Sequence, residues 1–415
     1  MTAELYRVNG PAAFWRLMAE PQPTEAEWAT SIQSAAALLP LGVQGADIDA
    51  LLQQTLGEGQ FGPDHWELSF ARKMYYRVKP VLPRRFTRGL RRLQRSAAAG
   101  DSPLGWPVES RYAQFLWSAI GGLLAGTKRQ SVPFIHFWPA GHKFAFVLTH
   151  DVETAEGQEH VQVLADLEMD YGFRSSFNFV PERYRLDHEL INALRARGFE
   201  VGVHGLKHDG KLFSSRAEFM RRATRINQYL KDLDAVGFRA PFMHRQPEWM
   251  QALDIEYDLS FFDTDPYEPI PGGTMSIWPF EIGRFVELPY TLVQDYTLTA
   301  VLGETTPRIW LEKVDFIETY WGLALVNSHP DYLKDPANWR LYEQFLQAMR
   351  RRAGPYWHAL PREVARWWRG RRQAASLELL PGAVVGTASL DPERGDTGIS
   401  ISQPPNRATQ QPVDR

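Results

Sequence analysis

The chain contains no cysteine among its 415 residues. Disulfide bonds, cysteine-ligated zinc and thiol nucleophiles are therefore excluded. Any metal ion must instead be bound by histidine, aspartate or glutamate side chains. The absence of cysteine indicates no compartment, because a chain without thiols tolerates both oxidising and reducing surroundings.

An excess of charge of one sign is also lacking, since 46 lysine and arginine residues stand against 49 aspartate and glutamate residues. We therefore expect no nucleic-acid partner. The longest apolar run, residues 116–125, is too short and too rich in glycine to cross a bilayer. The first residues do not combine a basic stretch with an apolar one, as a secretory signal does. These features predict a soluble, cytoplasmic protein.

The composition divides the chain into three zones. Residues 1–140 are rich in Ala, Leu, Trp and Arg at helical spacing, which predicts a mainly helical region of unknown role. Residues 141–372 alternate short apolar runs with amphipathic segments. Residues 373–415 turn to Gly, Pro, Ser, Asp and Gln, which predicts a disordered tail. The oligomeric state is left open.

The middle zone predicts an α/β fold. Helical spacing occupies residues 160–171, 189–197 and 217–233, between apolar runs that predict strands. Strands that alternate with helices imply parallel β-α-β units. About seven strands fit a distorted (β/α) barrel better than a flat doubly wound sheet, which is the alternative. The predicted strands are 144–149, 175–180, 200–203, 236–239, 257–262, 285–288 and 323–326.

Ionisable side chains follow five of these predicted strands. In a β/α barrel the carboxyl ends of the strands share one face, and active sites are built there. The alternative is that Asp, Asn and Pro simply begin loops, which accounts for Asp265 well but for His204 and Arg239 poorly. The residues concerned are Asp151, Glu153, His204, His208, Arg239, Asp263, Asp265 and His329.

His204 and His208 are the strongest single signal, because they lie four positions apart where a strand becomes a loop. Gly205 and Gly210 argue against a helix at this point. Two neutral imidazoles and one carboxylate form a three-ligand site that suits zinc or a similar divalent metal. The alternative is a pair of surface histidines that happen to be close.

The remaining residues can complete a hydrolytic centre. A metal lowers the pKa of a bound water, and a second carboxylate can then take the proton. A buried arginine would keep that carboxylate ionised, and a further histidine could protonate the leaving group. Asp151, Glu153, Arg239 and His329, together with the histidine pair, supply every role.

The chain resembles the polysaccharide deacetylase family, whose catalytic part is the NodB homology domain (carbohydrate esterase family 4). The resemblance covers roughly residues 140–350, and the motifs occur in the family's order. His204-Gly-Leu-Lys-His208 matches His-Ser/Thr-x-x-His, and Arg239-Ala-Pro241 matches Arg-x-Pro. Thr149-His-Asp-Val-Glu153 is similar to Thr-Phe-Asp-Asp-Gly, segment 257–266 to the aspartate motif, and Val326-Asn-Ser-His329 to Leu-x-His, with looser spacing.

The resemblance implies a distorted barrel and metal-dependent hydrolysis of an N-acetyl or related amide bond. It places the metal on His204 and His208, the base on Asp151, its orientation on Arg239 and the proton donor on His329. The family's second aspartate, a metal ligand, is Val152 here. Either Glu153 replaces it, which is the assignment we favour, or Asp151 is the ligand and another group is the base.

Three functions follow as hypotheses. The first is deacetylation of an N-acetylated sugar or polysaccharide, and the second is hydrolysis of a small non-sugar amide or ureide. The third is a non-catalytic envelope or membrane-associated binding protein. For the last, residues 68–100 hold ten Lys or Arg and no Asp or Glu, a pattern that could bind an anionic membrane weakly. We favour a helix with solvated arginines there.

Two sets of side chains on later loops are weaker candidates. Tyr267, Trp278, Tyr290 and Tyr296 could stack on a sugar ring, although large aromatics are more often core residues. Asp295 is a further candidate for the wall of the site.

Overall fold

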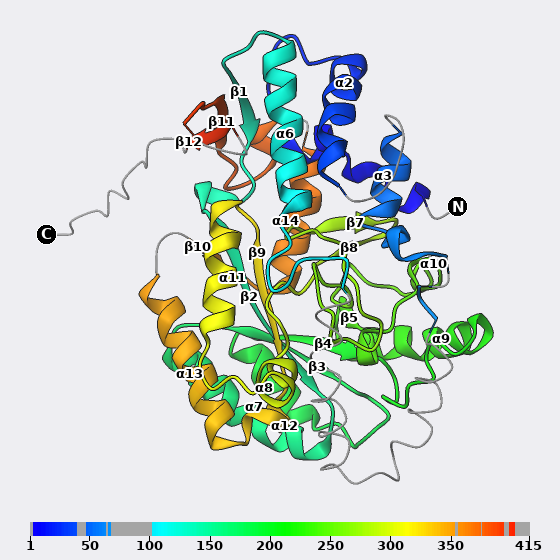
Figure 1. The fold of residues 1–415 in the computed structure, drawn as a ribbon. Helices are drawn as coiled ribbons and strands as arrows, with labels where there is room; N and C mark the ends of the chain where they lie inside the picture. The colour runs from blue at the N-terminus through cyan, green and yellow to red at the C-terminus, as the bar shows by residue number, and fades with distance from the viewer. Residues whose placement is uncertain are drawn as a thin grey trace, which may run out of the picture.

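The computed structural model describes residues 3–39, 47–63, 65–67, 102–352, 356–374, 376–393 and 398–402. Its centre is a nine-stranded sheet in the order β10-β2-β3-β4-β5-β6-β8-β7, with β9 paired to β2. The strands run parallel except β7, which pairs antiparallel with β8. The sheet curls (Figure 1), and the isolated bridge Leu292–Val326 joins the segment after β8 to β9.

This architecture confirms the predicted α/β class and the distorted barrel. All seven predicted strands are present, although several are shorter than their apolar runs. The three-residue strands β7 and β10 were missed because their length gives no periodicity. The strands of the barrel are β2 (Phe144–Val152), β3 (Ser175–Phe179), β4 (Glu200–His204), β5 (Gly237–Arg239), β6 (Tyr257–Asp258), β7 (Phe280–Ile282), β8 (Phe285–Glu287), β9 (Leu323–Ser328) and β10 (Tyr356–His358).

Helices follow the strands, and polar side chains fix where several of them begin. Thr154, Asp187, Ser215 and Asp335 each accept a hydrogen bond from a first-turn backbone N–H of the helix that follows, which satisfies donors that the helix cannot. The helices of the barrel are α7 (Ala155–Asp170), α8 (His188–Ala196), α9 (Arg216–Asp232), α10 (Pro247–Met250), α11 (Arg308–Thr319), α12 (Pro330–Leu333), α13 (Pro336–Arg351) and α14 (Pro361–Gln373).

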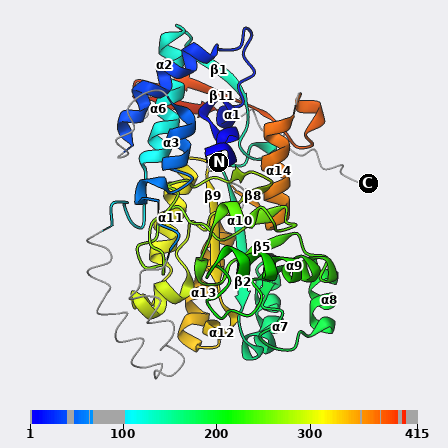
Figure 2. The same cartoon turned by 90° about the vertical axis from the view of Figure 1, so that its right-hand side faces the viewer.

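The first zone contains α1 (Pro11–Trp15), α2 (Glu25–Ala35), α3 (Ile48–Gln54) and α6 (Arg111–Gly126). Both views place α2 and α6 at the end of the molecule away from α7 and α12 (Figures 1 and 2). The buried guanidinium of Arg371 in α14 donates to the carbonyls of Phe14 and Ile135, so this zone shares buried contacts with the rest of the chain. The boundary at residue 140 stays a prediction.

The C-terminal zone is more ordered than the sequence predicts. Strands β11 (Val385–Leu390) and β12 (Ile399–Ser402) form an antiparallel sheet with β1 (Ser131–Ile135) in the order β1-β11-β12. The prediction of a disordered tail is therefore wrong for these two segments, whereas residues 403–415 lie outside the described residues. Composition misled here because the buried residues of β11 are the small Gly386 and Ala388, so the strand has no large apolar side chain facing a core.

Candidate metal centre

Adjacent strands bring the predicted residues to one edge of the sheet. Asp151 lies near the end of β2, and Glu153 directly follows that strand. His204 ends β4 and pairs in register with Arg239, which ends β5. His329 follows β9, the neighbour of β2 on its other edge. The parallel strand order therefore places all these residues on the same face of the barrel.

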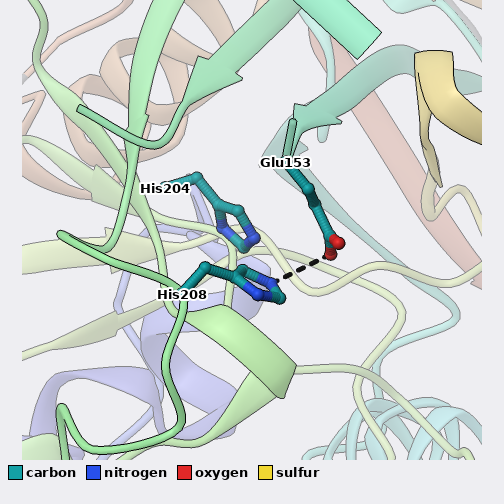
Figure 3. Close-up of side chains that lie close together, drawn as sticks. All are labelled: Glu153, His204 and His208. Carbon is teal, nitrogen blue, oxygen red and sulfur yellow. Dashed lines mark ion pairs between the residues drawn. The ribbon is translucent and has the colours of Figure 1, made fainter. Parts of the chain in front are cut away.

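Glu153, His204 and His208 form a compact cluster (Figure 3). Each offers one ligand atom, and these atoms lie within 4.8 Å of one another. The His208 Nε2 atom is 2.9 Å from Glu153 Oε1, and the side chains of Glu153 and His208 are 20% and 5% exposed. Two imidazole nitrogens and a carboxylate oxygen are a donor set that suits zinc or another divalent metal.

The hydrogen bonds of His204 fit a metal ligand. Its Nδ1 lies 3.1 Å from the carbonyl oxygen of Arg239, which can only accept, so Nδ1 carries the hydrogen. Burial lowers the His204 pKa to about 4, which keeps the ring neutral. Its Nε2 is buried and has no hydrogen-bond partner among the residues that the structure describes. A buried lone pair aimed at two other ligand atoms fits a metal.

Asp151 lies beside this cluster, within a separate hydrogen-bond network. It accepts from Arg239 Nη1 at 3.0 Å, from Asn327 Nδ2 at 2.9 Å and from Asn178 Nδ2 at 3.2 Å. Burial alone would raise the Asp151 pKa, but the Arg239 guanidinium and the neighbouring histidines outweigh it and hold that pKa below its usual range. Asp151 is therefore ionised, with Oδ2 3.9 Å from His204 Nε2.

Arg239 is fully buried. Besides Asp151, its guanidinium donates to Asn327 Oδ1 at 2.6 Å, to Thr149 Oγ1 at 3.0 Å and to the Leu259 carbonyl at 2.9 Å. Thr149 and Asn327 were not singled out from the sequence. Their register on neighbouring strands, Thr149 opposite Asn327, is the signal that would have found them.

His329 lies beside both Asp151 and Glu153, and Asp295 holds its ring. The two are joined by His329 Nδ1 and Asp295 Oδ1 at 2.7 Å, and the His329 backbone N–H donates to Oδ2 at 2.8 Å. Burial would lower the His329 pKa, but the Asp295 carboxylate outweighs it and raises the pKa to about 10. His329 is therefore a protonated imidazole whose Nε2 lies 4.0 Å from Asp151 Oδ2.

Some residues that the sequence suggested have other partners. Asp263 forms an ion pair with Lys313, and Asp265 accepts a hydrogen bond from Tyr290 at 3.0 Å. Trp278 and Tyr290 are buried core residues. Asp295, only a weak candidate in the sequence, is the partner of His329.

A glycine follows His204 because a side chain would not fit there. Gly205 has a φ of +62°, and a Cβ atom built on it would lie 2.4 Å from Cγ of Pro241. Both the left-handed backbone and the close approach of the proline therefore require glycine. Gly205 stands where the resembled motif has Ser or Thr, and the close packing of Pro241 explains this difference.

We expect Gly205→Ser, which restores that hydroxyl, to destabilise the protein by about 1–3 kcal/mol, because the new side chain must adopt a disfavoured φ and displace Pro241. Urea denaturation followed by tryptophan fluorescence would measure the loss. Gly126→Ala is the matched control, since a Cβ at this helical glycine meets nothing within 4 Å. A Gly205→Ser protein as stable as the wild type would contradict this account.

Comparison with known proteins finds similarity to solved structures alone: no family model and no curated protein matches the chain. A Mycobacterium smegmatis protein described as a polysaccharide deacetylase is 18% identical, with a TM-score of 0.46, over 57% of this chain and 94% of its own. A Pseudomonas aeruginosa protein of the same description is 17% identical, with a TM-score of 0.46, over 58% and 96%.

The PuuE allantoinase is similar at the same level, with 15% identity and a TM-score of 0.46 over 56% of this chain and 93% of its own. At these identities and scores, the similarities assign neither a function nor a role to any residue. The chain is thus defined by its own features, a curled parallel α/β barrel that carries a histidine–carboxylate cluster at the carboxyl ends of its strands.

Two further predictions concern membranes. None of the helices that the structure describes has the length and apolar composition needed to cross a bilayer. The basic segment 68–100, for which weak association with an anionic membrane was considered, lies outside the described residues.

Proposed function

We propose that this protein is a metal-dependent hydrolase of non-peptide carbon–nitrogen bonds, with zinc as the metal. Its leading substrate class is an N-acetylated sugar or polysaccharide. The observation that supports this most is the buried lone pair of His204 Nε2, aimed at the ligand atoms of His208 and Glu153. The ionised carboxylate of Asp151 and the protonated imidazole of His329 lie beside that cluster. Amide hydrolysis needs such a general base and general acid.

Glu153, His204 and His208 would hold the metal. When bound, a divalent metal supplies Lewis-acid activation of water and of the scissile carbonyl. Asp151 takes a proton from the attacking water, because its carboxylate stays ionised beside Arg239. Arg239 and Asn327 fix the direction of that carboxylate through the bonds they donate to it.

His329 donates a proton to the leaving group. The oxygen of water adds to the acyl carbon, the carbon–nitrogen bond breaks, and the nitrogen leaves as an amine once it has received a proton. The imidazolium of His329, which Asp295 holds protonated, donates that proton. After the step Asp151 is protonated and His329 is neutral, and the carboxylic acid product releases its own proton to solvent. Loss of one proton from Asp151 to solvent and uptake of one by His329 restore the starting charges of the site.

The test is a hydrolysis panel with the full chain loaded with zinc. We expect acetate release from chitooligosaccharides and no turnover of cyclic amides or ureides, which would release acid or ammonia. Turnover of only the small cyclic substrates would overturn the sugar assignment and favour the small-amide hypothesis. A zinc-loaded protein that hydrolyses neither class would overturn the enzyme proposal and favour the binding protein.

A further inference from the structure

A buried ion pair joins the first zone to a loop beside the metal centre. Glu58 accepts from Arg245 Nε at 2.8 Å and from Nη2 at 2.6 Å, and neither side chain is exposed. Burial would raise the Glu58 pKa, but Arg245 and His65 outweigh it and lower the pKa to about 2. Glu58 is therefore ionised, and such a two-pronged pair fixes orientation as well as distance.

Aromatic rings hold the guanidinium of Arg245 in one place. The ring centroids of Phe262, Trp66 and Phe261 lie 4.5, 5.0 and 5.2 Å from its central carbon. Trp66 comes from the first zone, whereas the two phenylalanines follow β6. A cation enclosed by rings and paired with a carboxylate has little freedom to move, so Arg245 is a fixed point of the barrel.

Arg245 also fixes the short strained segment before it. Its Nη1 donates to the carbonyl of Met243 at 2.9 Å. Met243 and Phe242 both have left-handed backbones, with φ of 52° and 60°. Residues with side chains rarely adopt this conformation, and it persists only where the surroundings enforce it. The bond from Arg245 to the Met243 carbonyl is such an enforcing contact.

This strained segment lies directly behind a metal ligand. The ring of Phe242 lies 4.3 Å from the ring of His208. His208 itself has a left-handed φ of 52°, so its position also depends on its packing. The preceding Pro241 packs against Gly205, the residue between the histidines at which a side chain does not fit. The segment 241–243 therefore supports both ends of the histidine loop.

We infer that Glu58 and Arg245 are positioning residues for the metal centre, and that the first zone thereby completes the site. The contacts run from Glu58 through Arg245 to the Met243 carbonyl, and from Phe242 to His208. This inference rests on the proposed metal-dependent function, since it concerns how tightly His208 is held as a ligand. It gives Glu58 and Trp66 of the first zone a role that the sequence left open.

The test measures zinc affinity of the folded, full-length protein by competition with a chromogenic chelator. We expect Glu58→Gln to weaken zinc binding by about tenfold or more, the size seen when partners of metal ligands are removed. The visible absorption spectrum of the cobalt-substituted protein should also change, because His208 no longer has a single orientation. Phe242→Ala should have the same two effects with the ion pair intact.

Arg245→Lys is a second, milder variant. It keeps a buried cation opposite Glu58, so the protein should fold, but the lysine cannot also reach the Met243 carbonyl. We expect it to weaken zinc binding in the same direction as Glu58→Gln. Glu281→Gln is the control: it weakens the ion pair of another buried carboxylate, with the partly exposed Arg372. It should lower stability while leaving the zinc affinity within about twofold of the wild type.

The outcomes separate this inference from the proposed function. A wild-type protein that binds no zinc overturns the proposed function itself. A wild-type protein that binds zinc, with Glu58→Gln and Arg245→Lys proteins that bind it equally well and give unchanged cobalt spectra, overturns the positioning role alone. If the Glu281→Gln protein loses zinc affinity as strongly as the Glu58→Gln protein, the loss reflects general destabilisation. That result would also overturn the positioning role.

Discussion

His204→Ala is expected to yield a folded protein that retains no zinc after dialysis and has lost at least about 10³-fold in activity, or ~4 kcal/mol of transition-state stabilisation. The reason is that His204 Nε2, like His208 Nε2, is a buried ligand atom of the cluster with no hydrogen-bond partner among the residues that the structure describes. Metal content by atomic emission and acetate release from chitooligosaccharides would measure the two effects.

His136→Ala provides a closely matched control. Like His204, His136 is buried, has a pKa lowered to about 4 by burial, and places Nδ1 on a backbone carbonyl, that of Trp138. It is not one of the residues of the cluster. Its replacement should cost stability but leave zinc binding unchanged. A His204→Ala protein that keeps zinc and full activity would show that the metal ligands have been assigned wrongly.

Asp151→Asn should separate catalysis from metal binding. We expect activity to fall by about 10²–10⁴-fold, the usual contribution of a general base, while zinc is retained. The substitution also leaves the buried Arg239 without its countercharge, which costs about 3–5 kcal/mol. Glu153→Gln should behave in the opposite way and lose zinc, because Glu153 is the carboxylate that lies among the ligand atoms.

The stability cost of Asp151→Asn needs its own control. Asp263→Asn breaks the buried ion pair of Asp263 with Lys313, outside the cluster, and should destabilise the protein while leaving its activity near the wild-type level. Activity per folded molecule, from assays at temperatures where each variant is folded, makes the comparison fair. Loss of zinc from Asp151→Asn with retention in Glu153→Gln would reverse the roles of the two carboxylates.

Much of the candidate site could be predicted because its residues occur at one repeated position, the end of a buried parallel strand. Asp151, His204, Arg239 and His329 all have this place in the chain. Strand periodicity locates the strand ends, and barrel geometry then brings them to one face. The same reasoning gave the fold class and the seven strands that alternate with helices.

Other parts of the molecule depend on contacts that no local pattern records. Asp295 lies on a loop, and only the folded chain brings it to His329. Glu58 pairs with Arg245, which lies 187 residues further along the chain, so nothing in its neighbourhood marks it. Strand β11 pairs with β1, which lies far earlier in the sequence, and its partly exposed residues resemble a tail. Tertiary pairing decided these three features.

The choice between Asp151 and Glu153 shows the limit of motif spacing most clearly. The resembled motif has adjacent aspartates, and Val152 here breaks that pattern. Along β2, side chains alternate between faces, so positions 151 and 153 point to the same side. Arg239, Asn327 and Asn178 then hold Asp151, whereas Glu153 contacts His208. The distribution of hydrogen-bond donors, not the spacing, distinguishes the two carboxylates.

The most direct measurement is anomalous diffraction at the zinc absorption edge, from crystals of the zinc-loaded protein. We predict one peak, in contact with His204 Nε2, a ring nitrogen of His208 and a carboxylate oxygen of Glu153, with Asp151 bound to Arg239 beside it. A protein that takes up no zinc, or a peak held by Asp151 while Glu153 points away, would contradict the account.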